Sequence, residues 1–190
     1  MTFAEAKKVS DEVWYKDLFK EEELKSFSQD EAASIIHKCM ETAQQCCDMF
    51  PDALAKQDFQ SVYAHYGVRI MSNAQMEATN LLAYYDATLN GLELQTNSIK
   101  QFYDRLLEAD LGEIISYEKL EEMILAHELY HVIEMNENDV YTYQKIDTRK
   151  FLFFSWKKRL VTASEIGAYH FTKLSCQLDF NPRALEEISL

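Results

Sequence analysis

Residues 124–133 read Ile-Leu-Ala-His-Glu-Leu-Tyr-His-Val-Ile, an apolar run without Gly or Pro, which favours a buried helix. Each residue of a helix turns by about 100°, so His127 and His131 lie one turn apart on the same face. Two imidazoles at this spacing can hold one metal ion. Glu128 lies beside them, where its carboxylate can accept a proton from a water bound to that ion. The spacing therefore predicts a metal site on this helix.

A structural interpretation without a metal is also open, in which both histidines pack within a core helix and bond to their neighbours. One buried histidine fits this interpretation easily. Two histidines and a glutamate among aliphatic side chains fit it less well, because each buried polar group needs its own partner there. The metal interpretation is therefore preferred.

The composition is that of a folded protein. A chain of 190 residues, 47% hydrophobic and 27% charged, predicts one compact domain with ample material for a core. The net charge of −13 argues against binding to a phosphate backbone or to an anionic membrane. We therefore expect no nucleic acid and no membrane among the partners.

Two features of the sequence predict a cytoplasmic location. The first 20 residues contain no uninterrupted apolar stretch, so we expect no signal peptide and no membrane span. The four cysteines form no C-x-x-C pair, and they are expected to be free thiols in a reducing compartment: Cys39, Cys46, Cys47 and Cys176.

Only four Gly and two Pro interrupt the chain, which favours helices. Residues 1–65 are expected to form a helical region packed on the core, with helices at 10–25, 28–49 and 51–64. The second helix begins with Ser28 and Glu31 in a capping box. The pattern then changes, because three short segments favour strands and Asn-Gly at 90–91 is typical of a tight turn. We expect a small sheet with strands at 68–72, 81–85 and 92–96.

The rest of the chain is predicted to be mostly helical, which makes the fold α+β. In chain order we predict a helix at 99–109 capped by Asn97 and Ser98, the metal-binding helix from Ser116 to Glu134, a loop over 136–148, an aromatic core cluster at 151–156, a solvated face or helix end at 157–159, a helix from Thr162 to Leu178, and a short helix after Asn181 and Pro182.

A catalytic zinc site usually takes three protein ligands and leaves the fourth position to water. The metzincin extension, which needs Gly and His after the second histidine, is not present in the sequence. We predict Glu165 as the third ligand, because Gly167 and Ala168 let its helix pack closely against the first.

Glu165 has alternatives. Thr162-x-x-Glu165 matches a capping box, in which Glu165 would only close the start of a helix. Glu134, Asp139 and His170 are competing third ligands. Glu134 follows His131 by three residues. It is therefore also suited to hydrogen-bond to a histidine ligand instead of binding the metal itself.

Together these segments resemble the minimal gluzincin metallopeptidases, and the ImmA/IrrE-type proteins in particular. The resemblance covers residues 66–182, about three-fifths of the chain: a strand ending in Tyr-Tyr-Asp, a strand Leu-Glu-Leu-Gln-Thr-Asn, a helix, Ala-His-Glu-x-x-His, and then Glu-x-x-Ala-x-x-Phe. The chain departs from those proteins at Tyr130, where they usually carry Gly. It also has no Asp four residues after Glu165.

The resemblance implies a zincin-like core over residues 66–190, with the sheet beside the His-Glu-x-x-His helix and an edge that holds an extended peptide. It implies one zinc ion held by His127, His131 and Glu165, with Glu128 as the general base. ImmA/IrrE-type proteins cleave repressor proteins, so the implied partner is a peptide or protein substrate.

Metal-assisted peptide hydrolysis also needs a donor that stabilises the developing oxyanion. Tyr169 and His170 are the nearest candidates in sequence, although either can equally be a packing residue.

Two other functions compete with a peptidase. A ferritin-like di-metal helical protein needs a second Glu-x-x-His motif, and the sequence contains none. A metal-binding regulatory protein without turnover would keep the same ligands and the same base, so the sequence leaves that alternative open.

Overall fold

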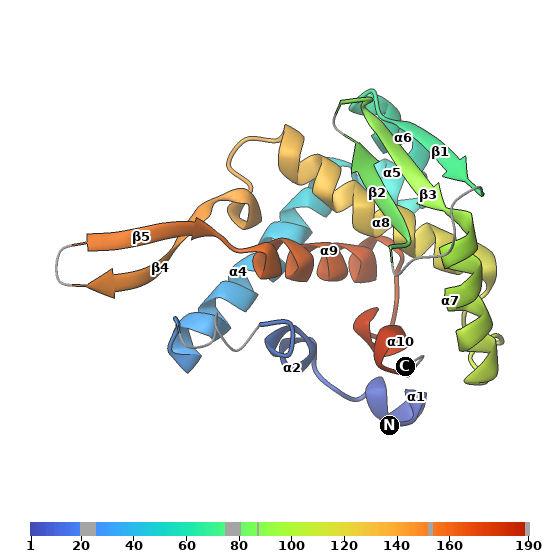
Figure 1. Ribbon diagram of the computed structural model, residues 1–190, viewed down its shortest axis with the longest axis horizontal. Coiled ribbons are helices and arrows are strands. Elements are labelled where there is room, and N and C mark those ends of the chain that lie inside the picture. Colours follow the sequence, from blue (N-terminus) through green and yellow to red (C-terminus); the bar gives the residue numbers. More distant parts are fainter. Residues whose placement is uncertain (20–25, 75–80, 87, 152–153, 189–190) are drawn as a thin grey trace.

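The computed structural model describes residues 1–19, 26–74, 81–86, 88–151 and 154–188 (Figure 1). Helices dominate and a small mixed sheet accompanies them, which confirms the predicted α+β, mostly helical class. In chain order the elements are α1 (Phe3–Ala6), α2 (Asp11–Lys16), α4 (Gln29–Met49), α5 (Pro51–Ala55), α6 (Phe59–His65), β1 (Arg69–Asn73), β2 (Ala83–Asp86), β3 (Gly91–Gln95), α7 (Thr96–Glu108), α8 (Tyr117–Asn136), the 3-10 helix η1 (Tyr141–Tyr143), β4 (Lys145–Phe151), β5 (Phe154–Arg159), α9 (Val161–Ser175) and α10 (Arg183–Ile188).

Three long helices form the centre of the molecule. α9 packs against both α4 and α8 (Figure 1). Their buried apolar side chains belong to one hydrophobic cluster. The same cluster contains Ala6, near the start of the described chain, and Leu185, near its end. The predicted metal-binding run therefore lies on a helix that is buried against another helix.

The sheet has the order β1-β3-β2. β1 runs parallel to the central strand β3, and β2 runs antiparallel to it. The three predicted strands are confirmed, with ends shifted by one or two residues. The predicted turn before β3 is present, and Asn90 adopts a left-handed φ of +44° there. As an edge strand, β2 lies beside α8, which puts one edge of the sheet next to the helix that carries His127 and His131.

The predicted helix starts are partly confirmed. Ser28 accepts a hydrogen bond from the backbone of Glu31 and forms the expected capping box of α4. Ser116 caps α8 by accepting a hydrogen bond from the backbone N–H of residue 119. The predicted caps of α7 are wrong, because α7 begins at Thr96 and so Asn97 and Ser98 lie within its first turn.

Two other segments differ from the prediction near the N-terminus. The single helix expected over 51–64 is divided into α5 and α6, because Gln57 between them adopts a left-handed φ of +55°. The helix expected over 10–25 is confirmed only as the short α2. The charged run at 20–25 lies outside the described residues.

The loop expected over 136–148 is also wrong in part. α8 continues to Asn136, and β4 already begins at Lys145. β4 and β5 pair as an antiparallel hairpin that projects away from the helices (Figure 1). The run 157–159, predicted as a solvated face or helix end, belongs to β5. The side chains of the aromatic segment 151–156 lie outside the described residues.

The four cysteines are free thiols, as predicted. Burial raises the pKa of the Cys46 thiol to about 12. In the described part of the chain, no helix combines the length and the apolar character needed to cross a membrane.

Candidate metal centre

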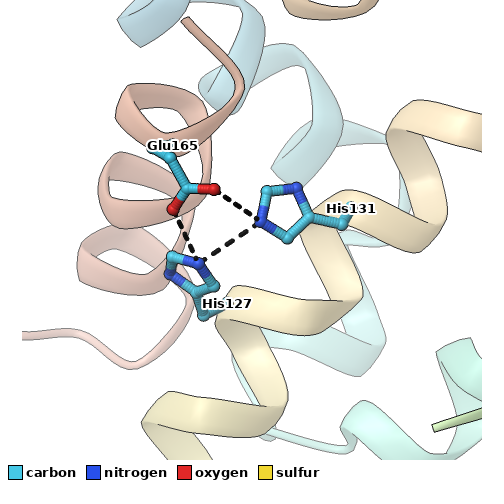
Figure 2. Close-up of side chains that lie close together, drawn as sticks. All are labelled: His127, His131 and Glu165. Carbon is cyan, nitrogen blue, oxygen red and sulfur yellow. Dashed lines mark hydrogen bonds and ion pairs between the residues drawn. The ribbon is translucent and has the colours of Figure 1, made fainter. Parts of the chain in front are cut away.

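Three side chains from two helices converge at one point (Figure 2). His127 and His131 come from α8, and Glu165 reaches them from α9. The two Nε2 atoms lie 3.3 Å apart. Glu165 Oε2 lies 3.3 Å from His127 Nε2, and Glu165 Oε1 lies 3.6 Å from His131 Nε2. The structure therefore brings together the three residues predicted as ligands.

These spacings match the geometry of a zinc ion. Two ligand atoms placed about 2.1 Å from a tetrahedral ion lie about 3.4 Å from each other. The three distances between the side chains, 3.3, 3.3 and 3.6 Å, lie close to that value. Two imidazole nitrogens with one carboxylate are also a donor set that zinc takes in catalytic sites. The residues present fit a zinc ion in geometry and in chemistry.

A close approach of α8 and α9 brings the three candidate ligands together. Tyr130 of α8 is fully buried and lies over Gly167 of α9. A Cβ atom at Gly167 would lie 2.2 Å from the hydroxyl oxygen of Tyr130, so no larger residue fits there without movement. The Tyr130 hydroxyl is itself held at 2.7 Å from Thr142 Oγ1. The predicted role of Gly167 in close packing thus has a specific partner.

The capping-box alternative for Glu165 is wrong. α9 begins at Val161 with Leu160 at its N-cap, and no side chain bonds there as a cap. Thr162 therefore lies inside the helix rather than before it. The Glu165 carboxylate is turned towards the two histidines instead (Figure 2).

A chain of hydrogen bonds fixes the orientation of His131. Ser164 Oγ donates to Glu134 Oε2 at 2.5 Å and lies 3.1 Å from His131 Nδ1. A carboxylate can only accept, so the serine hydrogen points to Glu134 and the serine oxygen accepts from His131 Nδ1–H. A proton on Nδ1 leaves the Nε2 lone pair free on the side where Glu165 lies. Glu134 therefore lies behind His131 and is linked to it through Ser164.

Glu134 is fully buried, so its charge needs compensation. Arg159 Nη2, at the end of β5, donates to Glu134 Oε2 at 3.2 Å. Burial raises the pKa of the Glu134 carboxyl, but its hydrogen bonds, first that with His131, lower it by more, so the pKa lies below its usual value. Glu134 is thus a carboxylate at neutral pH, as the hydrogen-bond chain requires.

The other two carboxyl groups differ from each other in their electrostatics. For Glu165, burial raises the pKa, and the hydrogen bond and charge of His127 outweigh burial, so the pKa is lowered. For Glu128, burial is the largest effect and raises the pKa, although His127 and His131 oppose it. Glu128 therefore binds a proton more readily than an ordinary glutamate does.

Glu128 and Tyr169 lie beside the three candidate ligands. Both line a cavity of about 180 Å³ that His127 also borders. The Tyr169 ring packs edge-on against the His127 ring, with 5.0 Å between their centroids. The Tyr169 hydroxyl donates to Glu186 Oε1 at 2.5 Å. Tyr169 is thus next to the site, with its hydroxyl already bonded.

His170 lies on another face of α9 and takes no part in this group. Five residues separate it from Glu165, which turns its side chain about 140° away. His170 Nδ1 lies 3.1 Å from the Tyr15 hydroxyl and 3.8 Å from Asp11 Oδ2, so it contacts α2. Asp139 is exposed beyond the end of α8. In the described part of the chain, the only potential metal-binding cluster is that of Figure 2.

Three residues around the centre were not predicted from the sequence: Ser164, Arg159 and Glu186. Ser164 carried no signal, because a serine before a glutamate is unremarkable in a helix. Arg159 was included in a cationic run interpreted as solvated. Its bond to Glu134 depends on the unpredicted hairpin, which ends beside α8.

Comparisons of the chain with protein-family models, with curated proteins and with solved structures returned no match.

Proposed function

We propose that the protein is a zinc-dependent metallopeptidase of the gluzincin type, with a zincin-like core similar to that of the ImmA/IrrE-type proteins. One observation carries the proposal. The Nε2 atoms of His127 and His131 and the carboxylate of Glu165 converge at spacings that suit one tetrahedral zinc ion. The general base expected beside such a site, Glu128, lines the adjacent cavity.

Each group has a defined part in the proposed reaction. His127, His131 and Glu165 would hold the ion. Bound zinc lowers the pKa of water towards about 7 and polarises a carbonyl group. Glu128 leaves the helix about 100° away from His127, so it faces the cavity rather than joining the ligands. Its carboxylate accepts the proton of the water that attacks the peptide carbonyl and returns it to the departing amine.

Tyr169 is the remaining candidate for a donor to the oxyanion, since His170 contacts α2. The Tyr169 hydroxyl now donates to Glu186 and would have to turn to reach a substrate oxygen. Tyr169→Phe removes that donor and keeps the ring that packs on His127. Loss of kcat with unchanged zinc content would assign the role to Tyr169.

The decisive experiment compares wild-type protein with Glu128→Gln at equal zinc content, on unfolded or repressor-like protein substrates. Gln keeps the size of the side chain and a hydrogen bond but removes the basic oxygen. Folding and zinc content should therefore survive, while hydrolysis should fall by about 10²–10⁴-fold, the usual range for a positioned general base. Equal cleavage by both proteins would show that Glu128 is not the base.

The same experiment addresses the metal-binding regulator. A regulator without turnover would bind zinc and cleave nothing in either form, across a broad panel of substrates. A ferritin-like protein would carry two irons per chain. The described residues supply one three-ligand cluster, which suits a single ion.

A further inference from the structure

A groove of about 300 Å³ lies at the base of the β4–β5 hairpin and shares no lining residue with the cavity beside Glu128. The start of α4, η1 and the start of β4 form its walls. Apolar or aromatic side chains make up much of the lining: Phe27, Ile35, Tyr141 and Ile146. Ligand-binding pockets begin at about this volume, so the groove is large enough to take side chains of a partner.

Two lysines line the same groove, Lys38 from α4 and Lys145 from β4. Both residues are exposed, and within the part of the chain that the structure describes neither forms an ion pair. Lys38 Nζ lies 5.4 Å from the centroid of the Tyr141 ring, a cation–π contact at the groove wall. Glu31 also lines the groove, and its Oε2 accepts a hydrogen bond from the backbone N–H of Ser28. The groove therefore presents two positive charges to solvent.

The hairpin that rises from this groove differs in charge from the rest of the chain. Residues 145–159 contain six of the 19 Lys and Arg residues but only one of the 32 Asp and Glu residues, Asp147. Their net charge is +5, and the remaining residues carry −18, which together give the −13 of the whole chain. The hairpin is thus a basic element on an acidic protein, and its charge favours an anionic partner.

The separation of charge limits which anionic partner fits. The hairpin projects away from the helices (Figure 1). A strand of the length of β4 spans roughly 20 Å, whereas salt screens charges over about 8 Å at physiological ionic strength. A short acidic segment can therefore contact the hairpin without approaching the acidic remainder of the chain. A nucleic acid or a second copy of the chain is a larger anionic body and would meet that remainder.

β4 offers backbone groups as well as charge. Among the described strands it pairs with β5 alone, so its other edge has N–H and C=O groups that no strand pairs. An extended peptide can add to such an edge, and its side chains then alternate between the two faces of the hairpin. At the groove β4 starts with exposed Lys145 and half-buried Ile146. Acidic and apolar side chains in alternation match this pair.

We propose that the groove and the free edge of β4 form a docking site for an extended segment of a partner protein in which acidic and apolar residues alternate. Its acidic side chains pair with Lys38 and Lys145, and its apolar side chains cover Phe27 and Ile146. The site needs neither zinc nor turnover, so it stands independently of the proposed peptidase activity.

A synthetic probe tests the docking site directly. A fluorescent peptide of about ten residues, the upper length of an ordinary strand, alternates glutamate with valine. It is titrated into the whole protein in the presence of a chelator, which prevents zinc-dependent cleavage of the probe. It should bind at least about tenfold more tightly than a glutamine–valine peptide or a glutamate–glycine peptide, because each of these lacks one of the two interactions. Its affinity should fall as salt is added.

Charge removal locates the binding surface. The double variant Lys38→Gln and Lys145→Gln should weaken binding of the glutamate–valine peptide by about threefold to tenfold, the range for two exposed ion pairs. Lys56→Gln with Lys100→Gln makes the same change in net charge at two exposed lysines outside the groove. This control should leave the affinity within about twofold of wild type.

Filling the groove is a second, independent change. Ser34 is an exposed residue of α4 that lines the groove, so Ser34→Trp should block it and weaken binding of the probe by about tenfold or more. Gln45→Trp, at an exposed position of the same helix outside the groove, is the matched control and should leave the affinity unchanged.

The outcomes separate this proposal from its alternatives. No binding of the glutamate–valine peptide, or equal weakening by both lysine pairs, would overturn the docking site. Duplex DNA that binds more tightly than the peptide, or a dimer in sedimentation that the Lys38 and Lys145 changes dissociate, would assign the surface to that partner instead. Zinc content is measured on the same protein: peptide binding without any zinc binding would support the docking site and refute the proposed function.

Discussion

Gly167→Ala tests whether the close packing of α8 against α9 builds the metal centre. The added Cβ would lie 2.2 Å from the hydroxyl oxygen and 2.4 Å from Cζ of Tyr130, whereas ordinary contacts begin at 3.4 Å. Tyr130 is fully buried and bonded to Thr142, so its ring has little freedom to move away. The two helices must then separate by roughly 1 Å.

The expected change in stability has two opposing parts. Gly to Ala within a helix normally stabilises by about 1 kcal/mol. Overpacking a core costs about 1–3 kcal/mol. Gly167→Ala should therefore range from neutral to about 2 kcal/mol destabilising, instead of stabilising. Tyr130→Leu removes the atoms that clash, and in that background Gly167→Ala should stabilise by about 1 kcal/mol.

The assay is urea unfolding of the four proteins in the presence of a chelator, so that metal binding does not enter the free energy of unfolding. Zinc affinity is measured separately by competition. Metal sites tolerate deviations of about 0.2 Å in ligand distance, so a helix shift of roughly 1 Å should weaken zinc binding by tenfold or more. A Gly167→Ala protein that is more stable by about 1 kcal/mol, with unchanged zinc affinity, would refute the reasoning.

Three further predictions concern the metal. The purified protein should carry about one zinc per chain by elemental analysis, and His127→Ala should abolish it; zinc that survives this change would rule out the predicted site. Glu165→Gln should weaken zinc affinity strongly and Glu134→Gln less so, and full zinc content in the Glu165 variant would require another third ligand. Ser164→Ala should lower zinc affinity by about 10–100-fold because His131 loses its orienting bond, whereas Ser175→Ala, whose hydroxyl donates to the backbone oxygen of Phe171 in the same helix, should not.

The parts of the site that lie on one helix could be predicted from the sequence. The spacing of His127 and His131 fixes their relative position once the segment is helical. The helix starts could be predicted as well, because the caps at Ser28 and Ser116 have clear sequence signals. Glu165 could be proposed because zinc needs a third ligand and a nearby helix offered one. Its competitor His170 could be separated from it only by the structure, in which that side chain contacts Tyr15.

Features that depend on tertiary contacts gave no such signal. Gln57 adopts a left-handed φ without being Gly or Asn, so the division of the helix at that point could not be foreseen. The β4–β5 hairpin was missed, and Arg159 with it, because a cationic side chain in a run of three is usually solvated. Its partner, Glu134, is far away in the sequence and is buried.

Tyr130 shows how a large residue at a helix crossing can be accommodated by the facing helix. Close approach of two helices requires a small residue at the crossing, but it does not require that residue to lie on a particular helix. Here the facing helix supplies it as Gly167, and the large ring fills the space. The pair, rather than either residue alone, is therefore the feature that keeps Glu165 within reach of both histidines.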